Sequence, residues 1–262
     1  MKKINKLFII IASFVLMGSF FSGCAERKKV SKIDEMKHDE IIAIVEQMSK
    51  DIVSEYKNTL SDFLEQPEDY NKKTKGQLYY FIGEKTKDIN STNKAINIFK
   101  EVLAEEPDNY LIKAFLGSAY ALRARDFPMK LITNLTPLGF LRLRYVHQGV
   151  RLLDQAVVSD DMNPMIRLIR GVTFKNLPKI FLQNDDGEKD LELLLYWLDN
   201  PTANKHYQDL LSESAFVSEA YFSIALFYLK EKKNSKSLFK KVFELDSKNP
   251  WSKASAKILR FQ

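Results

Sequence analysis

The spacing of apolar residues along most of the chain predicts amphipathic helices. In the first such segment, from Ile41 to Phe63, apolar residues recur at steps of three or four with acids and lysines between them, which places them on one side of a helix. Residues Gln66–Lys75 contain Pro67 and few apolar side chains, so we expect a connection there. No segment alternates apolar and polar residues as a half-buried strand does. The pattern therefore predicts an all-α fold.

After this connection the pattern repeats. Gly83 and Gly117 lie 34 residues apart, and each follows an apolar residue in an expected first helix. Ala95 and Phe99 mark an expected second helix, which Pro107 ends. Small residues let two antiparallel helices approach closely, and aromatic side chains fill the gap to the neighbouring pair. A single pair cannot bury its own apolar face, so the pairs must stack.

The same pattern returns near the C-terminus and, less regularly, in the middle of the chain. In residues 218–249, Ala225 occupies the small first-helix position and Phe239 an aromatic second-helix position. Three middle segments carry helical periodicity: Arg151–Val158, Arg167–Phe174 and Leu191–Leu198. Two irregular stretches interrupt them, at residues 127–139 and 177–187. We expect about four helix pairs after the leading helix.

This arrangement resembles the tetratricopeptide repeat, and the resemblance covers roughly Gly76–Gln262. It is specific at Gly76–Tyr120 and Ser218–Asn249 and approximate between them. Within the last repeat, Ser235 and Ser247 stand where the family usually has alanine and proline. The resemblance implies tetratricopeptide-like helical hairpins stacked in a right-handed superhelix, with irregular insertions, over residues 39–262.

The N-terminal residues follow a different pattern. A basic start, MKKINK, precedes about 15 almost wholly apolar residues from Leu7 to Phe21, too few for a bilayer span, which needs roughly 20. Ser22 and Gly23 supply the small residues that precede a cleavage site. Residues 1–23 are therefore expected to be a secretory signal peptide.

This segment resembles a bacterial lipoprotein signal, although Phe21 stands where that family prefers leucine. The resemblance implies cleavage before Cys24 and a diacylglyceryl group on its sulfur, whose acyl chains hold the mature protein on a membrane. The polar residues 24–38 then form a flexible tether. Ala25, the residue after the cysteine, is compatible with sorting of the lipoprotein to the outer membrane. We therefore expect the protein in the cell envelope, facing the periplasm or the exterior.

The cysteine content and the net charge of the chain exclude some disulfide and nucleic-acid-binding functions. Cys24 is the only cysteine, so the chain cannot form an internal disulfide. The alternative to lipidation is a free thiol in an uncleaved membrane anchor. The signal segment holds three lysines and no acid, so its removal lowers the formal charge from +6 to +3. This charge and the exported location argue against a nucleic-acid partner.

No pattern of catalytic residues stands out. His38, His147 and His206 are scattered and lack the spacing of metal ligands. The chain has no glycine-rich phosphate loop and no Gly-x-Ser-x-Gly elbow. Residues 184–188, NDDGE, lack the spacing of a calcium loop and are expected to form a plain turn. We therefore expect no enzyme activity, no metal and no cofactor.

Arginine is concentrated in the middle of the chain. Seven of the nine arginines lie between residues 123 and 170, where Lys130 is the only lysine and four acids occur. Guanidinium groups bind carboxylate or phosphate through paired hydrogen bonds. The pattern suggests an anion- or partner-binding face on the inner surface of the stack: Arg142, Arg144, Arg167 and Arg170. The alternatives are a solvated helix face or structural pairs with acids such as Asp126, Asp154 and Asp160.

Lipidation and helical repeats together give the functional hypothesis. A lipidated repeat protein with irregular insertions resembles the T component of TRAP-type solute transport systems, which associates with a periplasmic solute-binding protein. We therefore expect a membrane-anchored, non-catalytic binding or scaffold module for a protein partner. A more specific version of this hypothesis is that the module assists solute uptake. The alternative is a structural envelope assembly or biogenesis factor without a small-molecule ligand. A closed, arginine-lined cavity would favour a solute, and an open groove would favour protein recognition.

Overall fold

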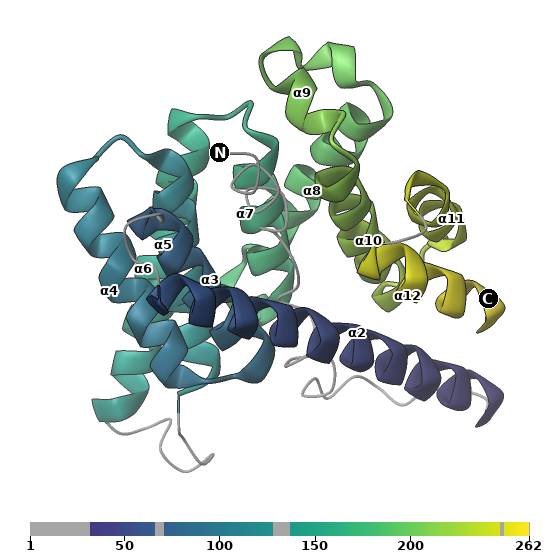
Figure 1. Cartoon of the computed structure of the whole chain (residues 1–262), viewed down its shortest axis with the longest axis horizontal. Coiled ribbons are helices and arrows are strands. Elements are labelled where there is room, and N and C mark those ends of the chain that lie inside the picture. The colour runs from purple at the N-terminus through teal and green to yellow at the C-terminus, as the bar shows by residue number, and fades with distance from the viewer. Residues whose placement is uncertain (1–31, 66–70, 128–136, 247–248, 262) are drawn as a thin grey trace.

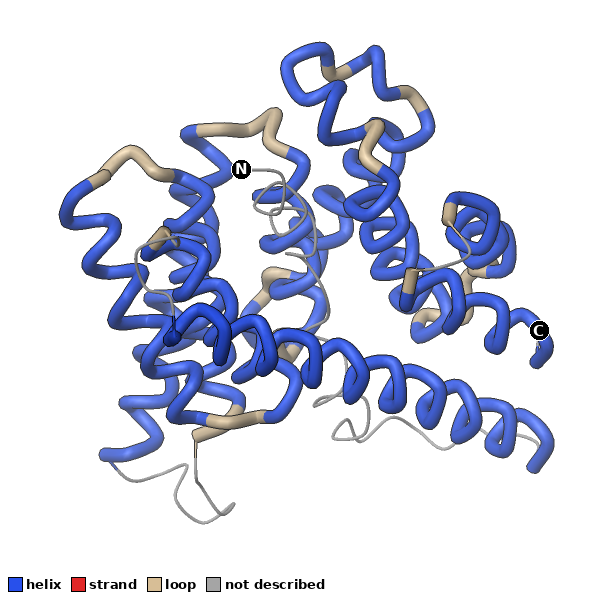
Figure 2. Tube along the Cα trace, viewed as in Figure 1, coloured by secondary structure: helices blue, strands red, loops and turns tan. Residues whose placement is uncertain are grey.

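The computed structural model describes residues 32–65, 71–127, 137–246 and 249–261. Helices joined by turns and short loops make up these residues, and no strand occurs among them (Figure 2). The all-α prediction is therefore confirmed. Cys24, the signal segment and most of the interruption at residues 127–139 lie outside the described residues.

Four helical hairpins follow a long leading helix, α2 (Lys32–Glu65), as expected. The hairpins are α3 (Lys72–Thr86) with α4 (Ile89–Glu105), α5 (Tyr110–Arg125) with α6 (Pro137–Ser159), α7 (Pro164–Asn176) with α8 (Asn184–Asp199), and α10 (Ser214–Lys230) with α11 (Lys236–Leu245). The short helices are η3 (Lys179–Phe181), η4 (Pro201–Ala203), η5 (Lys205–Tyr207), α9 (Gln208–Leu211), α12 (Pro250–Ile258) and η6 (Leu259–Phe261).

Asparagine and aspartate side chains fix where several helices begin. The Asp88 carboxylate accepts hydrogen bonds from the backbone N–H groups of Asn90 and Ser91, which caps α4. Asn163 caps α7 in the same way. Lys87, at φ 58°, is the left-handed residue that ends α3 directly before Asp88. The turn between α3 and α4 is therefore short, and α4 folds back along α3.

Glycines allow the two helices of a hairpin to touch, as the sequence pattern predicts. A Cβ on Gly149 would lie 2.6 Å from the carbonyl oxygen of Gly117, so α5 and α6 meet backbone to backbone. A Cβ on Gly83 would lie 2.9 Å from the backbone nitrogen of Thr92 in α4. The α7–α8 hairpin has the same close approach at Gly171. Any larger side chain at these crossings would force the paired helices apart.

Aromatic side chains fill the space between hairpins and within them. Phe99 of α4 stacks on Phe115 of α5, in the next hairpin, with ring centroids 5.8 Å apart. Within the last hairpin, Phe222 of α10 meets Phe239 of α11 edge to face at 5.5 Å. All four of these side chains are fully buried. Successive hairpins therefore share one apolar core and support one another.

The leading helix joins the two ends of the stack. α2 packs against α3 and continues along the stack to α12, near the C-terminus (Figure 1). Buried residues of α2, including Val45 and Ile52, belong to the same core as Trp251 and Ile258 of α12. The leading helix α2 and the short helix α12 near the C-terminus are thus in contact, an arrangement that local sequence patterns do not reveal.

Several element bounds differ from the prediction. α2 begins at Lys32, so residues 32–38 of the expected tether are helical. α3 begins at Lys72, inside the expected connection, because Asn71 caps it through a hydrogen bond from Lys73 N–H. Residues 184–188 form the first turn of α8 instead of a plain turn. The acids Asp185 and Asp186 suit that position because they face the positive end of the helix dipole.

Candidate functional site

Two of the four arginines that the sequence singled out bind a buried carboxylate of the chain itself. Arg167 Nη1 donates to Asp190 Oδ1 at 2.7 Å, and Arg170 donates through Nε and Nη2 at 2.6 and 2.9 Å. The Asp190 side chain has no solvent exposure. Arg170 Nη1 also donates to Asp154 Oδ1 at 3.0 Å. The pair between Arg170 and Asp154 is one of the structural pairs named above as an alternative to an anion-binding face. Arg170 thus ties α7 to both α6 and α8, and Arg167 ties α7 to α8.

The other two arginines lie on α6 and have different surroundings. Arg142 Nε donates to the carbonyl oxygen of Ala124 at 2.9 Å and so caps the end of α5. Arg144 is exposed and forms no hydrogen bond or ion pair within the described part of the chain. No hydrogen bond or ion pair among the described residues links these two arginines with Arg167, Arg170 or Asp190. Of the four, Arg144 is the one that forms no hydrogen bond or ion pair with the described residues, so its guanidinium group is free for a ligand.

A chain of hydroxyl groups crosses the inner side of the first three hairpins. Tyr80 of α3 shares a hydrogen bond of 2.8 Å with Ser118 of α5, and Ser118 shares one of 2.9 Å with Thr173 of α7. All three residues are buried. Burial raises the pKa of the Tyr80 phenol well above its ordinary value. The sequence gives little indication of this hydroxyl chain, because each of the three residues lies among apolar core residues.

A buried ion pair lies beside this hydroxyl chain. Lys85 Nζ is 3.3 Å from Glu84 Oε2, and the two side chains are only 3% and 1% exposed. Burial raises the pKa of Glu84 to about 7 and lowers the pKa of Lys85. Arg125 Nη2 donates to the Glu84 carbonyl oxygen at 3.0 Å. Because both side chains are closed to solvent, the shifted pKa values reflect packing between helices instead of an accessible acid–base site.

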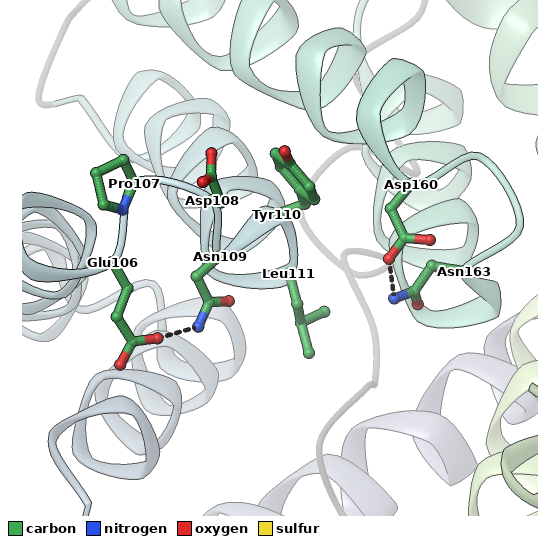
Figure 3. Close-up of a pocket in the computed structure, with 8 residues that line it drawn as sticks. All are labelled: Glu106, Pro107, Asp108, Asn109, Tyr110, Leu111, Asp160 and Asn163. Atoms are coloured by element: carbon green, nitrogen blue, oxygen red, sulfur yellow. Dashed lines mark hydrogen bonds between the residues drawn. The ribbon is translucent and has the colours of Figure 1, made fainter.

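An open hollow of about 480 Å³ lies at the edge of the stack, where the α4–α5 turn faces the α6–α7 turn (Figure 3). Its lining residues are Glu106, Pro107, Asp108, Asn109, Tyr110, Leu111, Asp160 and Asn163. Both walls are capped turns: Asn109 Oδ1 accepts from Ile112 N–H, and Asn163 Oδ1 accepts from Met165 N–H. These caps hold the walls in place without help from a ligand.

The carboxylates of the hollow differ in how they are engaged. Glu106 pairs with Lys73 at 2.6 Å, and hydrogen bonds from Lys73 and Asn109 lower its pKa. Asp160 Oδ2 accepts from the Tyr207 hydroxyl at 2.8 Å, and burial together with Asp160 raises the pKa of Tyr207 to about 12. The Asp108 carboxylate forms no hydrogen bond or ion pair with any described residue. Asp108 therefore remains free to bind a cation or a hydrogen-bond donor.

The Tyr110 ring adds an aromatic surface to this hollow, and Lys113 Nζ lies 5.0 Å from its centroid. The free carboxylate of Asp108, the ring of Tyr110 and the two backbone turns suit a polar or basic segment of a protein better than a small anion. The sequence marks both turns through Pro107 and Asn163-Pro164. That the two turns face each other depends on how α5 and α6 pack.

Within the described ranges, no group of three or more His, Cys, Asp or Glu side chains has a geometry that could hold a metal ion. Among the same residues, no one helix has the length and apolar character to cross a bilayer. One pair of helices bent by 89°, Lys205–Leu211 and Ser214–Lys230, meets that test by length and composition. Comparisons of the chain with protein families, curated proteins and solved structures found no significant match.

Proposed function

We propose that this protein is a membrane-anchored, non-catalytic binding module. A lipid on Cys24 holds it in the cell envelope, and a stack of tetratricopeptide-like hairpins presents the hollow at residues 106–111 to a protein partner. The lipoprotein-type signal at residues 1–23 supports the anchor. The four hairpins, three of which cross at glycines, support the repeat family, and with it a right-handed superhelix.

The open shape of the hollow favours a protein ligand over a small anionic solute. A small anionic solute would call for a closed cavity with free guanidinium groups, yet Arg167 and Arg170 are occupied by Asp190. The hollow is instead open and bears the free carboxylate of Asp108. A protein segment that carries a lysine or arginine fits this chemistry. A periplasmic solute-binding protein is one partner of this kind. If it is the partner, the more specific function is assistance to solute uptake.

The alternative function is a structural envelope assembly factor without a small-molecule ligand. The contact between α2 and α12 favours it, because it links the two ends of the stack. Rigid repeat stacks serve both as scaffolds and as binding modules. The two functions differ in whether one discrete partner occupies the hollow.

Site-specific crosslinking in native envelopes tests the proposal. A photoreactive residue replaces Asp161, which is exposed beside Asp160. We expect one discrete crosslinked protein, which Asp108→Arg abolishes by placing a cation in the hollow. Asp62→Arg, an equal change of charge at an exposed position of α2, should leave the crosslink intact. A crosslink that persists in the Asp108→Arg protein, or no discrete crosslink at all, would contradict binding at the hollow.

A further inference from the structure

Four large apolar side chains protrude into solvent at η3 and near the start of α6. Ile180 and Leu182, at and directly after the short helix η3, are 83% and 84% exposed. Phe140 and Leu143, near the start of α6, are 72% and 40% exposed. Isolated exposed apolar residues are common on protein surfaces, but a group of this size marks a contact surface.

The two segments lie side by side. The His147 ring of α6 meets the Phe181 ring of η3 edge to face, with centroids 6.3 Å apart. Phe140, Leu143 and His147 are spaced by three and four residues, so they follow one side of α6. We call this surface the α6–η3 edge and define it by seven residues: Phe140, Leu143, Arg144, His147, Lys179, Ile180 and Leu182.

The backbone of η3 holds its apolar side chains outward. The helix has only three residues, none of them buried, and Pro178 precedes it. Leu182 ends it in the left-handed region, at φ 57°. Residues other than glycine, asparagine and aspartate seldom adopt this conformation. The turn therefore projects two aliphatic side chains, Ile180 and Leu182, into solvent.

The charge around these tips is mainly positive, although Asp185 and Asp186 follow Leu182 in the first turn of α8. Residues 137–153 and 176–184 contain four cations, Arg142, Arg144, Arg151 and Lys179, and no acid. Arg144, Arg151 and Lys179 are exposed. The next acid on α6, Asp154, is already bound by Arg170. Exposed apolar tips among basic residues are typical of surfaces that bind anionic membranes.

The anchor would keep the start of α2 close to a bilayer. Only eight residue steps separate Cys24 from Lys32, where α2 begins, and a fully extended chain of that length reaches about 29 Å at most. A molecule held on so short a connection meets the membrane surface continually, so even weak contacts there become populated.

We propose that the α6–η3 edge lies on the lipid bilayer, with Ile180 and Leu182 inserted among the headgroups and Arg144 and Lys179 against anionic phosphates. The inference rests on the proposed lipid anchor at Cys24. It is independent of the hollow at residues 106–111, which remains available for a protein partner. A fluid bilayer accepts a projecting apolar side chain without a matching pocket, whereas the anchor residues of protein interfaces fill pockets on the partner.

Depth-dependent quenching of a label at Leu182 tests the proposal. The full chain is produced in a host that processes lipoproteins, and the purified mature protein is reconstituted into vesicles with one third anionic lipid and lipid-borne quenchers. The variant Leu182→Cys carries an environment-sensitive fluorophore. Since the native Cys24 sulfur is blocked by its lipid, the new thiol is the only labelling site. Leu245→Cys, at a leucine of α11 that is 41% exposed, is the matched control, and Ile180→Cys is a second reporter.

We expect quenching and a blue shift at Leu182 and Ile180 but not at Leu245. The double variant Arg144→Ala/Lys179→Ala should lower the ratio of docked to undocked protein about 25-fold, because each cation near an anionic surface contributes a factor of about five. Vesicles of neutral lipid should show a similar loss of quenching.

Three results would overturn the proposal, and they separate it from the proposed function. Vesicle-bound protein without quenching at Leu182 would refute the α6–η3 edge and leave the anchor intact. Shielding of Leu182 that occurs without vesicles and increases with protein concentration would show that a second copy covers the edge. Protein that is not retained on vesicles and reacts with the label at Cys24 would refute the anchor and the edge together.

Discussion

The buried carboxylate of Asp190 allows the roles of the arginines to be tested by one substitution. Arg170→Met removes two hydrogen bonds to Asp190 and one to Asp154, but keeps an unbranched side chain of similar length. Asp190 then retains only the contact of 2.7 Å from Arg167. A side chain that has no solvent exposure cannot recover those bonds from water.

The expected loss of stability follows from these contacts. Removal of one partner from a buried ion pair costs about 3–5 kcal/mol, because a buried charge is left without compensation. Since Arg167 remains bound to Asp190, we expect the lower end, about 3 kcal/mol. The partly exposed contact with Asp154 adds at most about 1 kcal/mol. With a urea m-value of about 2–3 kcal/mol per molar, the unfolding midpoint should fall by about 1 M.

Urea unfolding followed by circular dichroism measures this change. Arg144→Met, at an exposed arginine without a partner among the described residues, is the matched control and should change the stability by less than about 0.5 kcal/mol. The double variant Arg170→Met/Asp190→Leu should recover part of the loss, because it removes the uncompensated charge. If Arg170→Met were as stable as Arg144→Met, the Asp190 contacts would not be structural, and Arg170 would again be a candidate for anion binding.

Three further substitutions test the packing. Gly149→Ala should destabilise the fold by about 2 kcal/mol, because the new Cβ would lie 2.6 Å from the Gly117 carbonyl oxygen. This loss should appear in a thermal melt even though alanine usually favours a helix. An unchanged melting temperature would show that the two helices can separate freely. Ser118→Ala should cost about 1–3 kcal/mol because it breaks the hydroxyl chain in the middle, and a cost near zero would mean that Tyr80 and Thr173 do not depend on it. Burial raises the pKa of Glu84 from 4.5 to about 7, so the folded state favours the protonated acid. Its contribution to stability is present below pH 4.5 and is lost as the pH rises through about 7. Glu84→Gln should therefore flatten the pH dependence of the unfolding free energy in that window, whereas a profile identical to that of the parent protein would contradict a raised pKa.

The helical hairpins were predictable because their signals are local. Apolar spacing marks each helix, and a glycine such as Gly117 marks the point where two helices cross. The aromatic positions Phe99 and Phe239 are fully buried, as that pattern requires. The helix α12 was not predicted, because its nine residues contain few large apolar side chains. Trp251 and Ile258 become core residues only through contact with α2, which is far away in sequence.

The candidate site was less predictable, because it depends on which surfaces the hairpins bring together. The cluster of arginines is evident in the sequence, but Asp190 lies 20 residues beyond Arg170 and belongs to a different helix. Composition alone could not show that this one acid would bind two of the arginines. The hollow at residues 106–111 was not predicted either, since each of its walls is an ordinary capped turn in the sequence.

The lipid anchor underlies the proposed function, and the intact mass of the protein purified from membranes tests it most directly. We predict a chain that begins at Cys24 and carries the added mass of a diacylglyceryl group, and a Cys24→Ser variant that lacks this mass and is released from the membrane fraction. A chain that retains residues 1–23, or that begins elsewhere with an unmodified Cys24, would contradict the account.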